Sequence, residues 1–258
     1  MQTYRARRVL RADRRGSSWP VLIDTDAGVF YTKLRGAAQA PASLVAEVVV
    51  GALADALGLP VPARVLIDIP SDLGVDDPHQ ELAQLLGLSV GVNLGFQYLG
   101  GVQDFCQADV PRVEADLASR IVWLDGLVQN PDRTARNPNL LWSHDRLWLI
   151  DHGACLGFHH RWREVTEESP RTRGWRLGDH VLGSQATRLP LVDAVLTRVL
   201  DREALQTAVD GVPEAFLSIE GADAAMRRRA AYVAFLWKRL REPRPFMPPD
   251  TVAACGGA

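Results

Sequence analysis

The residues best suited to chemistry lie between positions 127 and 153. This segment contains Asn130-Pro131-Asp132-Arg133, then Asn137, then an apolar run that ends in Asp151-His152-Gly153. A proline turns the chain out of the preceding helix, so the Asp132 carboxylate can face a cleft and accept the proton of an attacking hydroxyl. Asn137 and Asp151 offer the oxygen donors that Mg²⁺ prefers. The set indicates phosphoryl transfer, with Asp132 as the catalytic residue and Asn137 and Asp151 as metal ligands.

Each piece of this segment, taken separately, also fits ordinary turn chemistry. Asn, Pro and Asp all favour turns, and Asp151-His152-Gly153 can simply end a strand. The phosphoryl-transfer interpretation therefore depends on their combination: a helix over residues 113–129 comes first, and a hairpin of suitable length separates the two pieces.

A candidate phosphate-binding lysine lies about a hundred residues upstream of this segment. Lys33 ends a predicted strand over residues 29–34 and would point inward together with Tyr31, because alternate strand residues share a face. A lysine on a buried face needs an anionic partner, and Glu47 on the following helix can provide one. We predict that Lys33 and Glu47 belong to the catalytic site, although a surface lysine on an edge strand is the simpler alternative.

Two segments could bind a nucleotide through the backbone. Gly16-Ser17-Ser18 lies between the first two strands, where its N–H groups and hydroxyls can surround phosphates. A plain hairpin turn explains it equally well. Gln97, Tyr98 and Leu99 join the two halves of the chain, so their backbone groups can pair with an adenine edge, or they can form an edge strand that closes into a glycine turn.

The order of predicted elements gives an α+β fold with two lobes. Apolar runs predict an antiparallel meander over 5–10, 20–24 and 29–34, with further strands at 63–69 and 93–99. Helical periodicity covers 42–57, 78–86 and, after about residue 110, most of the chain, interrupted by paired strands at 140–142 and 147–150. We predict a small antiparallel β lobe over residues 1–108 that binds nucleotide, and a larger helical catalytic lobe over 109–258.

Composition restricts the function classes. The chain has 258 residues and is 47% hydrophobic, so a substantial hydrophobic core is expected. Its formal charge of −2 and its pI near 6.3 give no reason to expect bulk nucleic-acid binding. Three widely spaced cysteines indicate neither a disulfide framework nor a zinc site. No stretch approaches the roughly 18 apolar residues of a membrane span. A cytoplasmic location is the simplest prediction.

These motifs resemble the HipA-like kinases, a bacterial branch related to the phosphatidylinositol 3- and 4-kinase fold. The likeness is to the short stand-alone form, and it covers most of the chain. Besides the two catalytic segments, it rests on these stretches: Gly16-Ser17-Ser18-Trp19-Pro20, Tyr31-Thr32-Lys33, Leu44-Val45-Ala46-Glu47 and Leu57-Gly58-Leu59-Pro60-Val61-Pro62. The family often has histidine at the position of Thr134.

The resemblance implies a protein-kinase-like fold and an ATP- and Mg²⁺-dependent enzyme. It implies that Asp132 is the catalytic Asp, that Asn137 and Asp151 bind Mg²⁺, and that Glu47 holds Lys33 against the ATP phosphates. The implied acceptor is a Ser or Thr hydroxyl of a protein, and an antitoxin-like partner is consistent with the family. Two alternatives stay open: a kinase for a sugar, antibiotic or lipid headgroup, with its acceptor pocket near residues 165–183, and a nucleotide-binding pseudokinase that acts as a partner-binding module.

Overall fold

A computed structural model describes residues 1–12, 19–37, 41–75, 80–173, 176–217 and 221–248 of the chain. The predicted phosphate-binding segment Gly16-Ser17-Ser18 lies outside these residues, so its role stays a prediction. Among the described residues, no helix has the length and apolar character needed to cross a bilayer.

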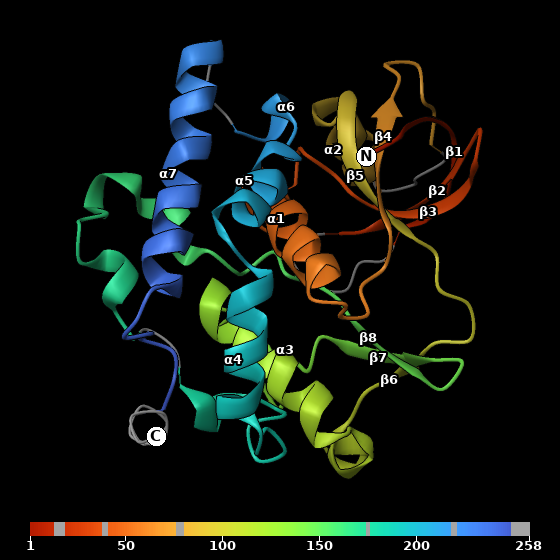
Figure 1. Ribbon diagram of the computed structural model, residues 1–258. Helices are drawn as coiled ribbons and strands as arrows, with labels where there is room; N and C mark the ends of the chain where they lie inside the picture. The colour runs from red at the N-terminus through yellow and green to blue at the C-terminus, as the bar shows by residue number, and fades with distance from the viewer. Residues whose placement is uncertain (13–18, 38–40, 76–79, 174–175, 218–220, 249–258) are drawn as a thin grey trace, which may run out of the picture.

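Five strands form a closed barrel in the N-terminal part of the chain (Figure 1). In spatial order they are β1 (Thr3–Ala12), β2 (Val21–Thr25), β3 (Gly28–Lys33), β5 (Gly91–Gln97) and β4 (Arg64–Ile69). Every second residue of β2 is buried, as the alternation of a half-buried strand requires. The barrel strands and the short helix α2 (Glu81–Leu88) share a small apolar core, to which Ile23 and Ile67 contribute fully buried side chains.

The expectation of a wholly antiparallel sheet is wrong at one pair of strands. Strands β1, β2, β3, β5 and β4 pair antiparallel in succession, but β1 and β4 pair parallel, with Thr3 opposite Leu66 and Arg5 opposite Asp68. The reason is topological. Strand direction cannot alternate all the way around a ring with an odd number of strands, so closure of five strands forces one parallel pair.

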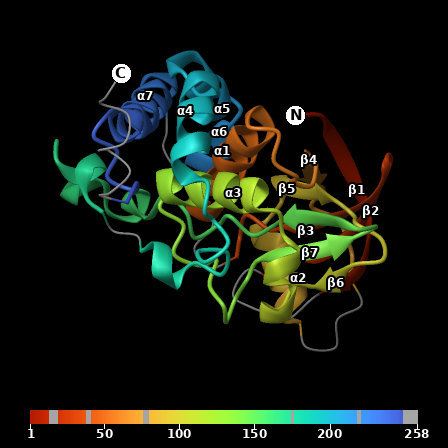
Figure 2. The same cartoon turned by 60° about the horizontal axis from the view of Figure 1, so that its bottom comes forward.

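Helix α1 (Ala42–Ala56) is buried along almost its whole length and lies between the barrel and the remaining helices (Figures 1 and 2). It is apolar around most of its circumference, as a helix covered on all sides should be. Its side chains belong to the same large core as those of α3 (Ala115–Val128), α4 (Leu189–Val199), α5 (Arg202–Asp210), α6 (Glu214–Leu217) and α7 (Ala222–Leu240). The predicted division at residue 108 stays a prediction.

A second, three-stranded sheet has the order β6 (Gln103–Asp104), β7 (Leu140–Ser143) and β8 (Arg146–Leu149). The predicted hairpin is present: its turn residues His144 and Asp145 have φ values of 48° and 56°, the left-handed conformation that tight hairpins favour. Short 3₁₀ turns at 107–112, 157–164, 169–171 and 177–179 were not predicted. The first of these turns lies between β6 and α3. The other three lie between β8 and α4.

Candidate functional site

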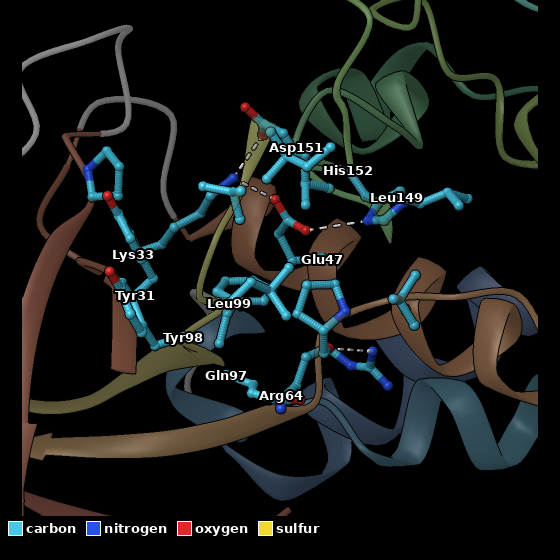
Figure 3. A pocket seen from close by; sticks show the side chains of 18 of the residues that line it. Tyr31, Lys33, Glu47, Arg64, Gln97, Tyr98, Leu99, Leu149, Asp151 and His152 are labelled. Carbon is cyan, nitrogen blue, oxygen red and sulfur yellow. Dashed lines mark hydrogen bonds and ion pairs between the residues drawn. The ribbon is translucent and has the colours of Figure 1, made fainter. Parts of the chain in front are cut away.

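A cavity of about 500 Å³ is lined by residues from the barrel, from α1 and from the end of β8 (Figure 3). Three of the predicted catalytic or metal-binding residues, Lys33, Glu47 and Asp151, line it. The predicted adenine-binding residues also line it, from the end of β5 and the residues just after it: Gln97, Tyr98 and Leu99. Residues far apart in the sequence therefore share one hollow, whereas the predicted Asp132 and Asn137 are not among the residues that line it.

Lys33 lies between two carboxylates that come from different elements. Its Nζ is 2.5 Å from Glu47 Oε1 and 2.6 Å from Asp151 Oδ1. Lys33 ends β3, Glu47 is in the second turn of α1, and Asp151 follows β8 with a left-handed φ of 54°, a conformation that Asp adopts more easily than most residues. The predicted ion pair between Lys33 and Glu47 is present.

The charges of this cluster reinforce one another. Burial by itself lowers the pKa of a lysine, but the carboxylates of Glu47 and Asp151 outweigh that effect and hold the Lys33 pKa well above its usual range. Burial by itself raises the pKa of Glu47, and the Lys33 ammonium outweighs it, so that the Glu47 pKa is held well below its usual range. Both groups are therefore charged at neutral pH. The Asp151 side chain, 42% exposed, opens toward solvent.

His152 belongs to this cluster, although the sequence analysis assigned it no role. It is buried, and its Nδ1 lies 3.5 Å from Glu47 Oε2 (Figure 3). Glu47 is thus contacted by Lys33 on one carboxylate oxygen and by His152 on the other. The only sequence signal was its place inside the Asp-x-Gly motif.

The loop of Asp132 is held by two neighbouring asparagines. Asn130 Oδ1 accepts the backbone N–H of Asp132 at 3.0 Å. Asn139 Nδ2 donates to the Asp132 carbonyl at 3.0 Å and to its Oδ2 at 3.3 Å. The half-buried Asp132 carboxylate is therefore fixed beside the start of β7.

Asn137 and Asn139 are placed very differently. Asn137 is exposed, and its backbone closes a turn with Thr134. Asn139 is buried and directly precedes β7, where its carbonyl accepts the N–H of Ile150 at 3.1 Å. Asn139 therefore lies next to both Asp132 and the residue that precedes Asp151. A five-residue spacing pointed to Asn137, whereas the position immediately before an apolar strand was the signal for Asn139.

A buried polar network around Asp125 holds the Asp132 loop in place. Asp125 Oδ2 accepts from Arg133 Nε at 2.6 Å and contacts His180 Nε2 at 2.9 Å, and its Oδ1 accepts from Asn130 Nδ2 at 2.8 Å. Burial alone would raise the Asp125 pKa, but Arg133 and His180 outweigh it and hold the pKa far below its usual range. Arg133 is thus a buried structural cation.

The predicted adenine-binding residues at the end of β5 lie at the cavity, but part of their backbone is already used in a hydrogen bond. Gln97 N–H donates to the Ala63 carbonyl at 2.8 Å, so a nucleotide base cannot take that donor. At the rim, the Tyr98 and Tyr31 rings stack in parallel with centroids 6.2 Å apart, and Arg11 donates to the Tyr31 hydroxyl. These groups form a flat aromatic edge to the cavity.

With the site described, comparison with known proteins identifies the family. A sequence model of the HipA-like kinases matches residues 6–216. The chain belongs to the HipA-like kinases. Among solved structures, a Helicobacter pylori proinflammatory kinase, CtkA, is similar with a TM-score of 0.51 and 11% identity, over 89% of this chain and 95% of that one. That identity shows a shared fold alone. No curated protein sequence matches the chain.

The oxygen donors near the cavity can be compared with what a metal ion requires. Among the described residues, no group of three or more His, Cys, Asp or Glu side chains could hold a metal ion by itself. Mg²⁺ in kinases needs only one or two protein oxygens, because water and phosphate oxygens complete its shell. The partly exposed Asp151 carboxylate and the amide oxygen of Asn139 are donors of that kind.

Proposed function

We propose that this HipA-like kinase transfers the γ-phosphate of ATP, with Mg²⁺, to a Ser or Thr hydroxyl of a protein. One observation carries the proposal: the Lys33 ammonium lies within 2.6 Å of carboxylates from α1 and from the end of β8, at the wall of a cavity. A buried cation held in this way is a fixed binding point for phosphate oxygens. The family membership supports phosphoryl transfer in general, and this cluster supports the ATP-dependent form of it.

In the proposed mechanism, each group has one task. Lys33, oriented by Glu47, binds the phosphates of ATP, and Asp151 and Asn139 would hold the metal. Mg²⁺ held there would supply positive charge against the phosphate oxygens. Asp132 accepts or orients the proton of the acceptor hydroxyl, and the polar network behind its loop keeps the carboxylate in place. Fixed positions supply most of the acceleration, because little covalent chemistry is asked of the protein.

Binding of a nucleotide beside Lys33 can be tested without any acceptor by chemical labelling of lysines. The chain has two lysines, Lys33 and Lys238, so one can serve as the control for the other. An ATP analogue that carries an acyl group on its γ-phosphate acylates a lysine next to the phosphates. We expect acylation of Lys33, and we expect unmodified ATP with Mg²⁺ to suppress it. Lys238, which pairs with Glu167 on the surface, is an internal control. Equal labelling of both lysines, or labelling of Lys33 that ATP does not suppress, would refute the nucleotide site.

The choice between the two asparagines gives a second prediction. Asn139→Ala should lower kcat at least about tenfold, because it removes both the proposed amide ligand of the metal and the hydrogen bonds to Asp132. Asn137→Ala, in the same loop but exposed, should change kcat less than about twofold. Steady-state kinetics of the two variants show which asparagine contributes to kcat. Thermal unfolding checks that both variants are folded. The reverse order of effects would restore Asn137 as the ligand.

The acceptor class is tested by incubating the protein with γ-labelled ATP, Mg²⁺ and cell extract. Label on a protein, absent when the metal is chelated, supports the proposed acceptor. Label found only on low-molecular-weight compounds would replace it with a small-molecule acceptor. ATP binding with no transfer to any fraction would leave a pseudokinase.

A further inference from the structure

A second cavity, of about 860 Å³, adjoins the loop of Asp132. The residues on both sides of Asp132 line it: Asn130, Pro131, Arg133 and Thr134. None of these four lines the cavity that contains Lys33. The residues around the proposed catalytic residue therefore border the second cavity and not the one that contains Lys33.

The second cavity carries uncompensated positive charge. Arg173 and Arg176 line it and are exposed, and neither has an ion-pair partner among the described residues. Asp179 is the one acidic residue among the described lining residues, while the charge of Arg133 is already matched by Asp125. Two guanidinium groups thus face a single carboxylate, and guanidinium groups bind carboxylates through paired hydrogen bonds.

The segment that carries both arginines is anchored on each side. On one side, the fully buried Arg239 donates to the carbonyls of Pro170 at 3.1 Å and Thr172 at 2.8 Å. On the other side, Val181 N–H donates to the Arg133 carbonyl at 3.0 Å, and His180 joins the network of Asp125. Thr172, next to Arg173, is therefore tied to a buried arginine, and His180 and Val181, which follow Arg176 in the chain, are tied to the groups that hold the Asp132 loop.

The remaining lining is apolar. Phe246 and Met247 are buried behind the cavity, and Leu177 and two prolines complete this part of it. A ligand with both acidic groups and a backbone or apolar part would match such a surface. This mixture is what an extended acidic segment of a polypeptide presents.

We infer that the second cavity binds the acceptor, and that the acceptor is a protein segment with acidic residues beside the Ser or Thr that is phosphorylated. This inference rests on the proposed function and specifies its substrate class. Arg173 and Arg176 bind the acidic side chains, and the hydroxyl lies at the Asp132 loop. The two arginines select the acceptor and take no part in nucleotide binding.

The test compares serine peptides flanked by glutamates with the same peptides flanked by lysines. Binding is measured by fluorescence anisotropy, without transfer, for the wild type and for Arg173→Glu/Arg176→Glu. We expect the wild type to bind the glutamate peptide at least about tenfold more tightly, and the double variant to reverse that order. Arg198→Glu/Arg202→Glu makes the same charge change at exposed positions of α4 and α5 and should retain the wild-type preference.

Two results would overturn the inference: a wild type without preference for the glutamate peptide, or a double variant that keeps it. Acylation of Lys33 by the ATP analogue is measured on the same samples and should be identical in all three proteins. Lost peptide preference with normal acylation would reject the acidic acceptor alone. Absent acylation in the wild type would reject the nucleotide site, and with it the kinase mechanism, whatever the peptides do.

Discussion

Replacing Arg133 by methionine is expected to lower the free energy of unfolding by about 3–5 kcal/mol. Arg133 is 1% exposed and Asp125 is fully buried, and their side chains are 2.6 Å apart. Methionine fills a similar volume but leaves the Asp125 carboxylate without its main cation. It also leaves the carbonyl of Asn139 without the guanidinium that contacts it. Urea denaturation of the two proteins measures the difference directly.

A surface pair provides the comparison for this prediction. Arg120 and Asp116 are 2.6 Å apart on α3, four residues from each other and partly exposed. Arg120→Met should change the stability by less than about 1 kcal/mol, because water screens and replaces the exposed interaction. Adding Asp125→Asn to Arg133→Met should recover part of the loss by removing the unpaired charge. If Arg133→Met and Arg120→Met destabilise the protein equally, the buried network does not hold the loop.

Asp132→Asn is expected to lower kcat by a factor of about 10²–10⁴, the usual contribution of a positioned general base. Asparagine has the same shape and can keep the hydrogen bond from Asn139, so the fold and the loop should be unchanged. Nucleotide binding should also be unchanged, because Lys33, Glu47 and Asp151 are intact. Single-turnover transfer from γ-labelled ATP, beside acylation of Lys33, separates the two effects.

The control for this variant is Asp145→Asn in the exposed turn between β7 and β8. It makes the same chemical change near the site without touching the loop, and it should transfer phosphate at the wild-type rate. An Asp132→Asn variant that retains more than about a third of the wild-type kcat would show that Asp132 is not the base. A variant that also loses ATP binding would show that Asp132 acts earlier, on the nucleotide.

Local patterns in the sequence predicted most of the elements and one ion pair of the candidate site. Helices over 42–57 and 113–129 correspond to α1 and α3, because a 3.6-residue apolar period leaves few other ways to bury those side chains. The pair of Lys33 and Glu47 was also predictable. A lysine on an inward strand face needs a carboxylate, and the next helix offered Glu47.

Only the tertiary structure decided the features that depend on distant segments. The parallel pair of β1 and β4 follows from closing five strands into a ring. Asp125 and His180 are in contact although 55 residues separate them along the sequence, and no sequence motif relates them. Asn139 rather than Asn137 lies at the Asp132 carboxylate, because the chain turns once more before β7 begins.

The sequence by itself therefore determined the kinds of groups available and their local spacing, since helix and strand periods are properties of the backbone. It determined that Asp132 and Asp151 flank a hairpin and that Lys33 ends a strand. The tertiary structure decided which of these groups share a cavity and which become buried. Buried polar groups must find partners wherever the fold supplies them, and those partners come from any part of the chain.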